Sequence, residues 1–258
     1  MKHLSRNKHS IYFLPILFLS LGAISPTGFA AEVEWGYEGE TGQEFWAELS
    51  PEFHLCGEGT QQSPVDIVAA MEYEDSPKVK LKYKKTPLVI KNNGHTIEVE
   101  YETGSMLKLD GEEYRLLQFH FHTPSEHTVD GGPFPMEAHL VHINSSGQLA
   151  VVGIFMEEGD ENEFIQTIWD YMPIQEGEML VENTDINVKH FLPDDDEAYF
   201  HYAGSLTTPP CSEGVKWFVL NESVEVSAAQ IMQFKAIFPL NARPVQALND
   251  RIIHISED

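Results

Sequence analysis

Apolar and polar side chains alternate through most of the middle of this chain. Because side chains of a β-strand point alternately to its two faces, runs of this kind predict strands with one buried face. Glycines at 94, 104, 111 and 147 fall between the runs, where turns are needed. Strands are predicted at 79–83, 88–91, 96–101, 106–109, 114–122, 136–143 and 149–156, and later at 199–202 and 215–220.

Two segments have helical periodicity instead. In 160–171, apolar residues recur at helical spacing before Pro173. In 227–238, Ser227 and Gln230 form the pattern of a capping box. No repeat or long linker divides the chain. We therefore predict a mostly β (α+β) fold, a single domain with a central, mainly antiparallel sheet and a few short peripheral helices.

The alternation is strictest from Gln118 to His122. Gln118, His120 and His122 share one face of the predicted strand, and Phe119 and Phe121 share the other. Two imidazoles on one face, about 6.6–7 Å apart along the strand, can converge on a single ion. This stretch therefore predicts part of a metal site.

The predicted strand at 136–143 offers a third ligand. Glu137, His139 and Val141 share one of its faces. A lone strand histidine is usually structural, but a glycine-rich connection joins this strand to the one that carries His120 and His122. Three neutral imidazoles suit Zn²⁺ and leave a fourth position for water, which is the arrangement of a catalytic zinc site.

Neighbouring polar residues are suited to orient these ligands. Gln118 lies two residues before His120, and Glu137 lies two residues before the third histidine. Each can accept a hydrogen bond from a ligand N–H, which fixes the ring tautomer. The alternative, that both are ordinary polar strand residues, stays open. His142 points to the face opposite that of His139, and His127 follows the strand, so we expect both to be structural.

A rival interpretation concerns Glu126. The spacing of His120, His122 and Glu126 matches part of the cupin metal motif, in which this glutamate would be a ligand. However, Tyr114 stands where that motif has a glycine, and a second motif around His139 is missing. The cupin interpretation is therefore the weaker one.

The N-terminal segment has the composition of a secretory signal peptide. Three basic residues precede a 14-residue apolar run at 11–24, and a Ser-Pro pair and small residues follow. The run is short for a transmembrane helix, although an uncleaved anchor is the alternative. We predict a signal peptide at 1–30, cleaved near Ala30–Ala31, a mature domain at 31–258, and a periplasmic or secreted protein.

The net charge of the mature chain limits which partners it can bind. Removing 1–30 leaves 13 basic and 41 acidic residues, so the mature charge is 13 − 41 = −28. Such a chain repels nucleic acid and anionic membranes, and neither is expected as a partner.

Cys56 and Cys211 are the two cysteines. In an exported protein they predict a disulfide, with two free thiols as the alternative.

Motifs along nearly the whole mature chain resemble those of the α-class carbonic anhydrases, and the signal peptide and cysteine pair resemble the exported bacterial branch. The motifs are WGY at 35–37, QSPVDI at 62–67, NNGH at 92–95, QFHFH at 118–122, SEHTVDG at 125–131, EAHLVH at 137–142, LAVVGIF at 149–155, YAGSLTTPP at 202–210, Trp217 and NARPVQ at 241–246.

The resemblance implies a twisted, mainly antiparallel sheet of about ten strands with zinc at the foot of a conical cleft. It implies that His120, His122 and His139 hold Zn²⁺, and that a zinc-bound hydroxide attacks CO₂ to form bicarbonate, reversibly. It also implies cis peptide bonds before Pro64 and Pro210.

The same resemblance assigns roles around the metal. Thr207 would accept a hydrogen bond from the zinc-bound hydroxide and donate one to ionised Glu126, which is consistent because a carboxylate can only accept. An apolar pocket for CO₂ would be formed by Val141, Val151, Leu206 and Trp217, with Thr208 at its border.

His95 resembles a proton shuttle. Each hydration cycle must release a proton, and a histidine that titrates near neutrality can pass it to buffer. Tyr37, Asn93 and Thr208 would order the connecting waters. Glu98 stands where many relatives have an amide, which puts the rate of proton transfer, but not the zinc chemistry, in question.

Two other functions remain to be distinguished from this one. A non-catalytic carbonic-anhydrase-related binding protein would typically lack a zinc histidine, whereas this chain keeps all three. A zinc esterase would use the same nucleophile, so weak ester hydrolysis is expected as a side reaction. Exported bacterial relatives are often dimers, which leaves a homodimer open.

Overall fold

The computed structural model describes residues 33–72 and 76–256, so the predicted signal peptide lies outside the described residues. The short helices are α1 (Trp46–Leu49), α2 (Leu55–Glu58), α3 (Glu163–Trp169) and α4 (Ala228–Lys235), with 3₁₀-helices at Gly39–Thr41, Gln43–Phe45, Pro51–Phe53 and Val188–Phe191. The strands are β1 (Asp66–Ile67), β2 (Met71–Glu72), β3 (Val79–Lys82), β4 (Thr86–Asn92), β5 (Ile97–Glu100), β6 (Met106–Leu109), β7 (Glu112–His122), β8 (Thr128–Val129), β9 (Gly132–Pro133), β10 (Met136–Ile143), β11 (Leu149–Glu158), β12 (Gly177–Ile186), β13 (Tyr199–Ser205), β14 (Glu213–Leu220), β15 (Val224–Val226) and β16 (His254–Ser256).

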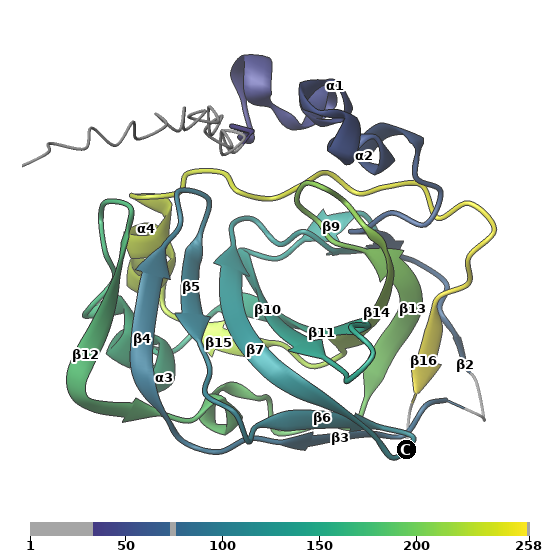
Figure 1. The fold of residues 1–258 in the computed structure, drawn as a ribbon. Helices are drawn as coiled ribbons and strands as arrows, with labels where there is room; N and C mark the ends of the chain where they lie inside the picture. Colours follow the sequence, from purple (N-terminus) through teal and green to yellow (C-terminus); the bar gives the residue numbers. More distant parts are fainter. Residues whose placement is uncertain (1–32, 73–75, 257–258) are drawn as a thin grey trace, which may run out of the picture. The chain divides into compact units, whose positions relative to one another are not determined.

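Thirteen of the described strands form one large, twisted sheet (Figure 1). Ten of them follow in the order β12-β4-β5-β7-β10-β11-β14-β13-β16-β2, and β3, β6 and β15 pair beside this path. Neighbours are antiparallel except for β11 with β14 and β15, and β16 with β2. The prediction of a mostly β fold with a central, mainly antiparallel sheet and few short helices is confirmed.

The two faces of β7 differ as the alternation of apolar and polar residues predicts. Phe119 and Phe121 are completely buried, and the Phe121 ring lies 4.8 Å from that of Trp169 in α3 and 6.3 Å from that of Phe234 in α4. The helices therefore cover the phenylalanine face. The opposite face, which carries His120, is called the histidine face below.

Local sequence signals place the helix ends well. The side chain of Asn162 accepts hydrogen bonds from the N–H groups of Phe164 and Ile165, so α3 begins at Glu163 and not at 160 as the periodicity suggested. The capping box of Ser227 and Gln230 is confirmed.

Strand β12 was not predicted. It lies at one edge of the sheet and most of its side chains are exposed, so its sequence has no regular apolar alternation. It pairs with β4, so Glu178 lies opposite Lys91, and β4 and β5 separate it from β7.

Candidate metal centre

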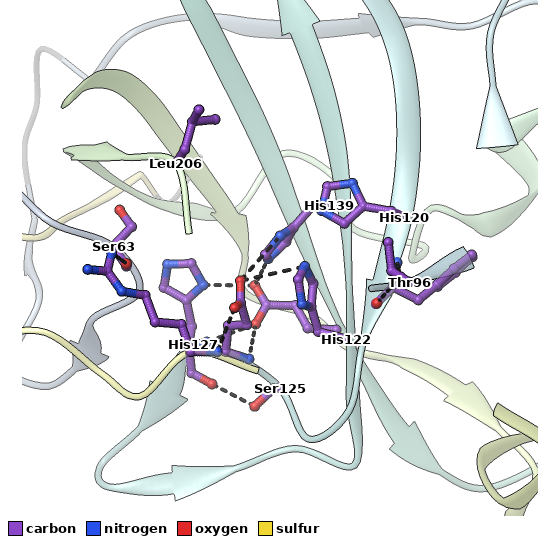
Figure 2. A network of polar contacts seen from close by, with 12 residues as sticks. Ser63, Thr96, His120, His122, Ser125, His127, His139 and Leu206 are labelled. Atoms are coloured by element: carbon purple, nitrogen blue, oxygen red, sulfur yellow. Dashed lines mark hydrogen bonds and ion pairs between the residues drawn. The ribbon is translucent and has the colours of Figure 1, made fainter. Parts of the chain in front are cut away.

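Pairing of β7 with β10 brings the three predicted ligands together. The two strands are antiparallel, and His139 lies opposite His120 while Glu137 lies opposite His122. One nitrogen from each of His120, His122 and His139 lies within 4.8 Å of the others. Figure 2 shows the three imidazoles converging from the two strands.

Each ligand histidine uses its other nitrogen as a donor. His120 Nδ1 donates to Gln118 Oε1 at 2.8 Å, and His139 Nε2 donates to Glu137 Oε1 at 2.9 Å. The two acceptors predicted from the sequence are therefore in place. The nitrogens left with a lone pair are Nε2 of His120 and Nδ1 of His139.

His122 has an acceptor that sequence reasoning missed. Its Nδ1 donates to the backbone carbonyl of Asn241 at 2.7 Å. Asn241 belongs to the NARPVQ motif, but a carbonyl contact leaves no signature in the side-chain pattern. His122 Nε2 is buried and has no hydrogen-bond partner among the described residues. A buried nitrogen with an unused lone pair, beside two others, is what a metal ion requires.

The protonation behaviour of the cluster agrees with this donor set. Burial, together with the neighbouring histidines, lowers the pKa of His120 well below its ordinary value, and burial also lowers the pKa of His122. Burial opposes protonation of His139 too, but the adjacent Glu137 carboxylate outweighs it and raises the pKa of His139. Burial therefore favours the neutral form of two of the three rings.

Glu137 is the most fully bonded side chain near the site. Its Oε2 accepts the backbone N–H groups of Glu126 and His127 at 2.9 and 2.8 Å. Its Oε1 accepts from His127 Nδ1 at 2.8 Å and from His139 Nε2. Burial alone would raise its pKa, but these two histidines bring the pKa of Glu137 well below the ordinary value. The carboxylate thus stays ionised and holds His139 in one tautomer.

His127 is structural, as expected, but it is part of this network. Its Nε2 accepts from the Tyr202 hydroxyl at 2.7 Å, because its Nδ1 already donates to Glu137. A glycine completes the arrangement. A Cβ at Gly153, opposite His139, would lie 2.9 Å from Glu137 Oε1, so a side chain there would displace the carboxylate.

Glu126 lies beside the ligands but its expected partner does not reach it. Its Oε1 accepts the backbone N–H of Arg243 at 2.8 Å, and its Oε2 lies 3.6 Å from His122 Nε2 and 3.7 Å from His139 Nδ1. In the described part of the chain, Oε2 has no hydrogen-bond partner. The expected bond from Thr207, itself buried, is therefore not formed in this structure, and the role of Thr207 stays a prediction.

The residues predicted to form an apolar pocket lie together. Val141 of β10 is opposite Val151 of β11, which is opposite Trp217 of β14. These three and Leu206 belong to one apolar cluster. The Trp217 ring lies 4.8 Å from that of His139, so the apolar surface begins at the metal ligands.

His95 lies in the turn between β4 and β5. Its imidazole stacks on the Trp35 ring, with centroids 3.6 Å apart and planes at 9°. Asn93 Oδ1 accepts the backbone N–H groups of His95 and Thr96 at 3.0 and 2.9 Å, so Asn93 holds this turn in shape. Burial and the Glu126 charge raise the pKa of Tyr37 well above its ordinary value, so its hydroxyl stays protonated.

The segment that carries Thr207 and Thr208 is anchored covalently. The predicted disulfide between Cys56 and Cys211 is present, and Cys211 N–H donates to the Thr208 carbonyl at 2.9 Å. The peptide bonds before Pro64 and Pro210 are cis, as expected.

Comparison with known proteins decides the family. The model of the eukaryotic-type carbonic anhydrases matches residues 41–257. The chain belongs to this family. The cupin interpretation of Glu126 is therefore wrong.

Carbonic anhydrases from several bacteria are similar to this chain. One from Nostoc sp. is 47% identical and the match covers 87% of this chain and 86% of the relative. One from Pectobacterium atrosepticum is 42% identical over 91% of this chain and 96% of the relative.

Solved structures of the family have the same fold. The α-carbonic anhydrase from Thermovibrio ammonificans in complex with sulfanilamide has a TM-score of 0.83 at 41% identity, covering 87% of this chain and 100% of that chain. Dioscorin complexed with ascorbate has a TM-score of 0.81 at 32% identity, covering 87% and 98%. The chain is thus a carbonic anhydrase that interconverts CO₂ and bicarbonate, in a family that is generally zinc-dependent.

Proposed function

We propose that His120, His122 and His139 hold the Zn²⁺ ion with which this carbonic anhydrase hydrates CO₂. The observation that carries the proposal is that the two nitrogens of each imidazole have different roles. One nitrogen donates to a fixed acceptor, and the other faces the same point within 4.8 Å of its counterparts. Neutral imidazoles with fixed tautomers are the ligands that Zn²⁺ prefers.

A bound Zn²⁺ ion would lower the pKa of water by several units and so supply a nucleophile at neutral pH. The protein supplies orientation and a dry surface. Val141, Val151 and Trp217 offer an apolar wall to CO₂, which carries no charge. Glu126 is a buried carboxylate whose Oε2 has no hydrogen-bond partner among the described residues, so it can accept a hydrogen bond from a hydroxyl such as that of Thr207.

We propose that His95 passes the released proton to buffer. It lies in the turn before β5, and its ring is half-buried against Trp35 rather than packed in the core. Imidazole titrates near neutral pH, so it can accept and release a proton in each cycle. Asn93 fixes the turn that carries it.

The test is stopped-flow CO₂ hydration with metal content measured on the same sample. We expect activity to be lost with a chelator and restored by Zn²⁺. The variant His139→Ala should lose both bound metal and activity, whereas Glu197→Gln, on an exposed loop, should keep both. Full activity of metal-free protein would refute the assignment of the ligands.

A second candidate function is the binding of a small organic ligand in addition to catalysis. The similarity to dioscorin, which was solved with ascorbate, is the observation that favours it. It predicts that such a ligand binds to protein that also hydrates CO₂. Ester hydrolysis, if present, should fall together with CO₂ hydration in His139→Ala, because both would use the same nucleophile.

We also propose that the protein is exported. The disulfide is the supporting observation, since such bonds persist in oxidising compartments. Within the described residues, no helix is long and apolar enough to cross a membrane. Fractionation of cells that produce the full chain, followed by N-terminal sequencing of the mature protein, tests both export and cleavage near Ala30.

A further inference from the structure

A row of charged side chains leads from the edge of the sheet to the metal ligands. Glu98 of β5 lies directly opposite His120 of β7. Lys91 of β4 lies opposite Glu98, and Glu178 of β12 lies opposite Lys91. Residues directly opposite each other in antiparallel strands share a face, so the whole row lies on the histidine face.

The turn that carries His95 lies beside this row, because it joins β4, which bears Lys91, to β5, which bears Glu98. A Cβ at Gly94 would lie 3.0 Å from Glu176 Oε1, so the Glu176 carboxylate packs against this turn. Three carboxylates and one ammonium group therefore belong to the strands and turns that adjoin the His95 turn. Within the described part of the chain, no salt bridge joins Lys91 to Glu98 or Glu178, so their charges are not neutralised by contact.

Glu98 is the member of the row nearest the metal. It is half-buried, and burial raises its pKa, while Lys91 lowers it. Lys91, which lies directly opposite on β4, is the cationic side chain that acts on the Glu98 carboxylate.

We infer that Glu98 makes this enzyme selective for the charge of the buffer that accepts its proton. The inference rests on the proposed shuttle role of His95. The step itself is simple: the imidazolium of His95 gives its proton to a base, and the base gains one positive charge. A neutral base such as imidazole becomes a cation, which the carboxylates attract. A dianion such as hydrogen phosphate must first approach them and is repelled.

The size of the effect follows from Coulomb's law. For a dianion about 8 Å from one carboxylate, removing that carboxylate should speed the encounter about three- to fourfold at about 10 mM ionic strength, and hardly at all at about 1 M. A neutral base should show little change. Lys91 acts in the opposite direction, so removing its charge should slow phosphate further.

The test compares imidazole and phosphate, which both titrate near neutral pH, as proton acceptors in stopped-flow CO₂ hydration. It is made with zinc-loaded protein at about pH 8, where carboxylates are ionised. From the dependence of turnover on buffer concentration, each buffer gives a second-order rate constant. We expect the ratio of the imidazole rate constant to the phosphate rate constant to fall about three- to fourfold in Glu98→Gln at low salt. The ratio should rise in Lys91→Gln. In Glu98→Asp, which keeps the charge, the ratio should equal that of the wild type. The matched control Glu197→Gln removes the same charge from the loop before β13 and should leave the ratio unchanged.

An unchanged ratio in Glu98→Gln, or a change that persists at high salt, would overturn the inference. If Glu98 only ordered water, its replacement would change turnover in both buffers by the same factor. Turnover at saturating imidazole tests the proposed function separately. Protein that hydrates CO₂ with an unaltered ratio refutes only the role of Glu98, whereas absence of zinc-dependent hydration refutes the proposed function.

Discussion

His142 should make this protein sensitive to acid. It lies on β10 with no exposed surface, on the face opposite the metal ligands. Its Nδ1 donates to the Ala150 carbonyl at 3.3 Å, so its Nε2 accepts the Tyr83 hydroxyl at 3.0 Å. Burial lowers the pKa of His142 to about 4, and the carbonyls of Ala150 and Leu140 offset only part of this.

The sign and size of the effect follow from linkage. An unfolded chain has a histidine pKa of about 6.5, so as the pH falls the unfolded state takes up a proton before His142 does. The stability that depends on neutral His142 is therefore complete above about pH 6.5 and is lost as the pH falls toward about 4. The loss should be about 2 kcal/mol at about pH 5 and about 3 kcal/mol at the limit. Domains are stable by only about 5–15 kcal/mol, so this loss is large.

Denaturant unfolding, followed by tryptophan fluorescence, measures this loss. The free energy of unfolding of metal-free wild-type protein and His142→Gln would be compared at about pH 7.5 and about pH 5, and the fall with pH should be about 2 kcal/mol smaller in the variant. Other titrating groups contribute equally to both proteins and cancel. His190→Gln, which replaces an exposed histidine, is the control and should behave as the wild type does. If His142→Gln loses as much stability as the wild type over this range, the buried, neutral state of His142 is refuted.

Three further predictions concern the site and its support. His95→Ala should slow CO₂ hydration in dilute buffer and be rescued by added imidazole, while zinc content stays unchanged; full turnover in dilute buffer would contradict the shuttle role. Glu137→Gln should weaken zinc binding about 10–100-fold, measured by competition with a chelator, because an amide cannot accept all four hydrogen bonds that this carboxylate accepts. Replacing Cys56 and Cys211 with serine should lower the free energy of unfolding by up to about 5 kcal/mol in a denaturant titration, because the bond closes a long loop, and an unchanged midpoint would show that the loop contributes nothing.

The sequence pattern was sufficient to predict those structural properties that depend only on residues close together in the chain. The alternation of Phe119 and Phe121 with His120 and His122 determines which side chains share a face, because successive strand residues point to opposite sides. The cap of α4 is equally local, since Ser227 and Gln230 bond within one turn. The disulfide could be predicted because the chain has two cysteines and therefore one possible pairing.

Other properties depend on strand register, which joins residues far apart in sequence. His122 finds its acceptor at the Asn241 carbonyl, 119 residues away, and no side-chain pattern marks a carbonyl. His127 lacks any ligand-like spacing, yet folding places it between Glu137 and Tyr202, 75 residues away.

The histidines of Gln118–His122 could thus be predicted as ligands from the sequence by itself, because alternation and residue chemistry act within one strand. Only the tertiary structure decided what surrounds them. The row from Glu178 to His120 exists because four strands pair in one register, and a shift of one residue in any of them would turn its charge to the opposite face.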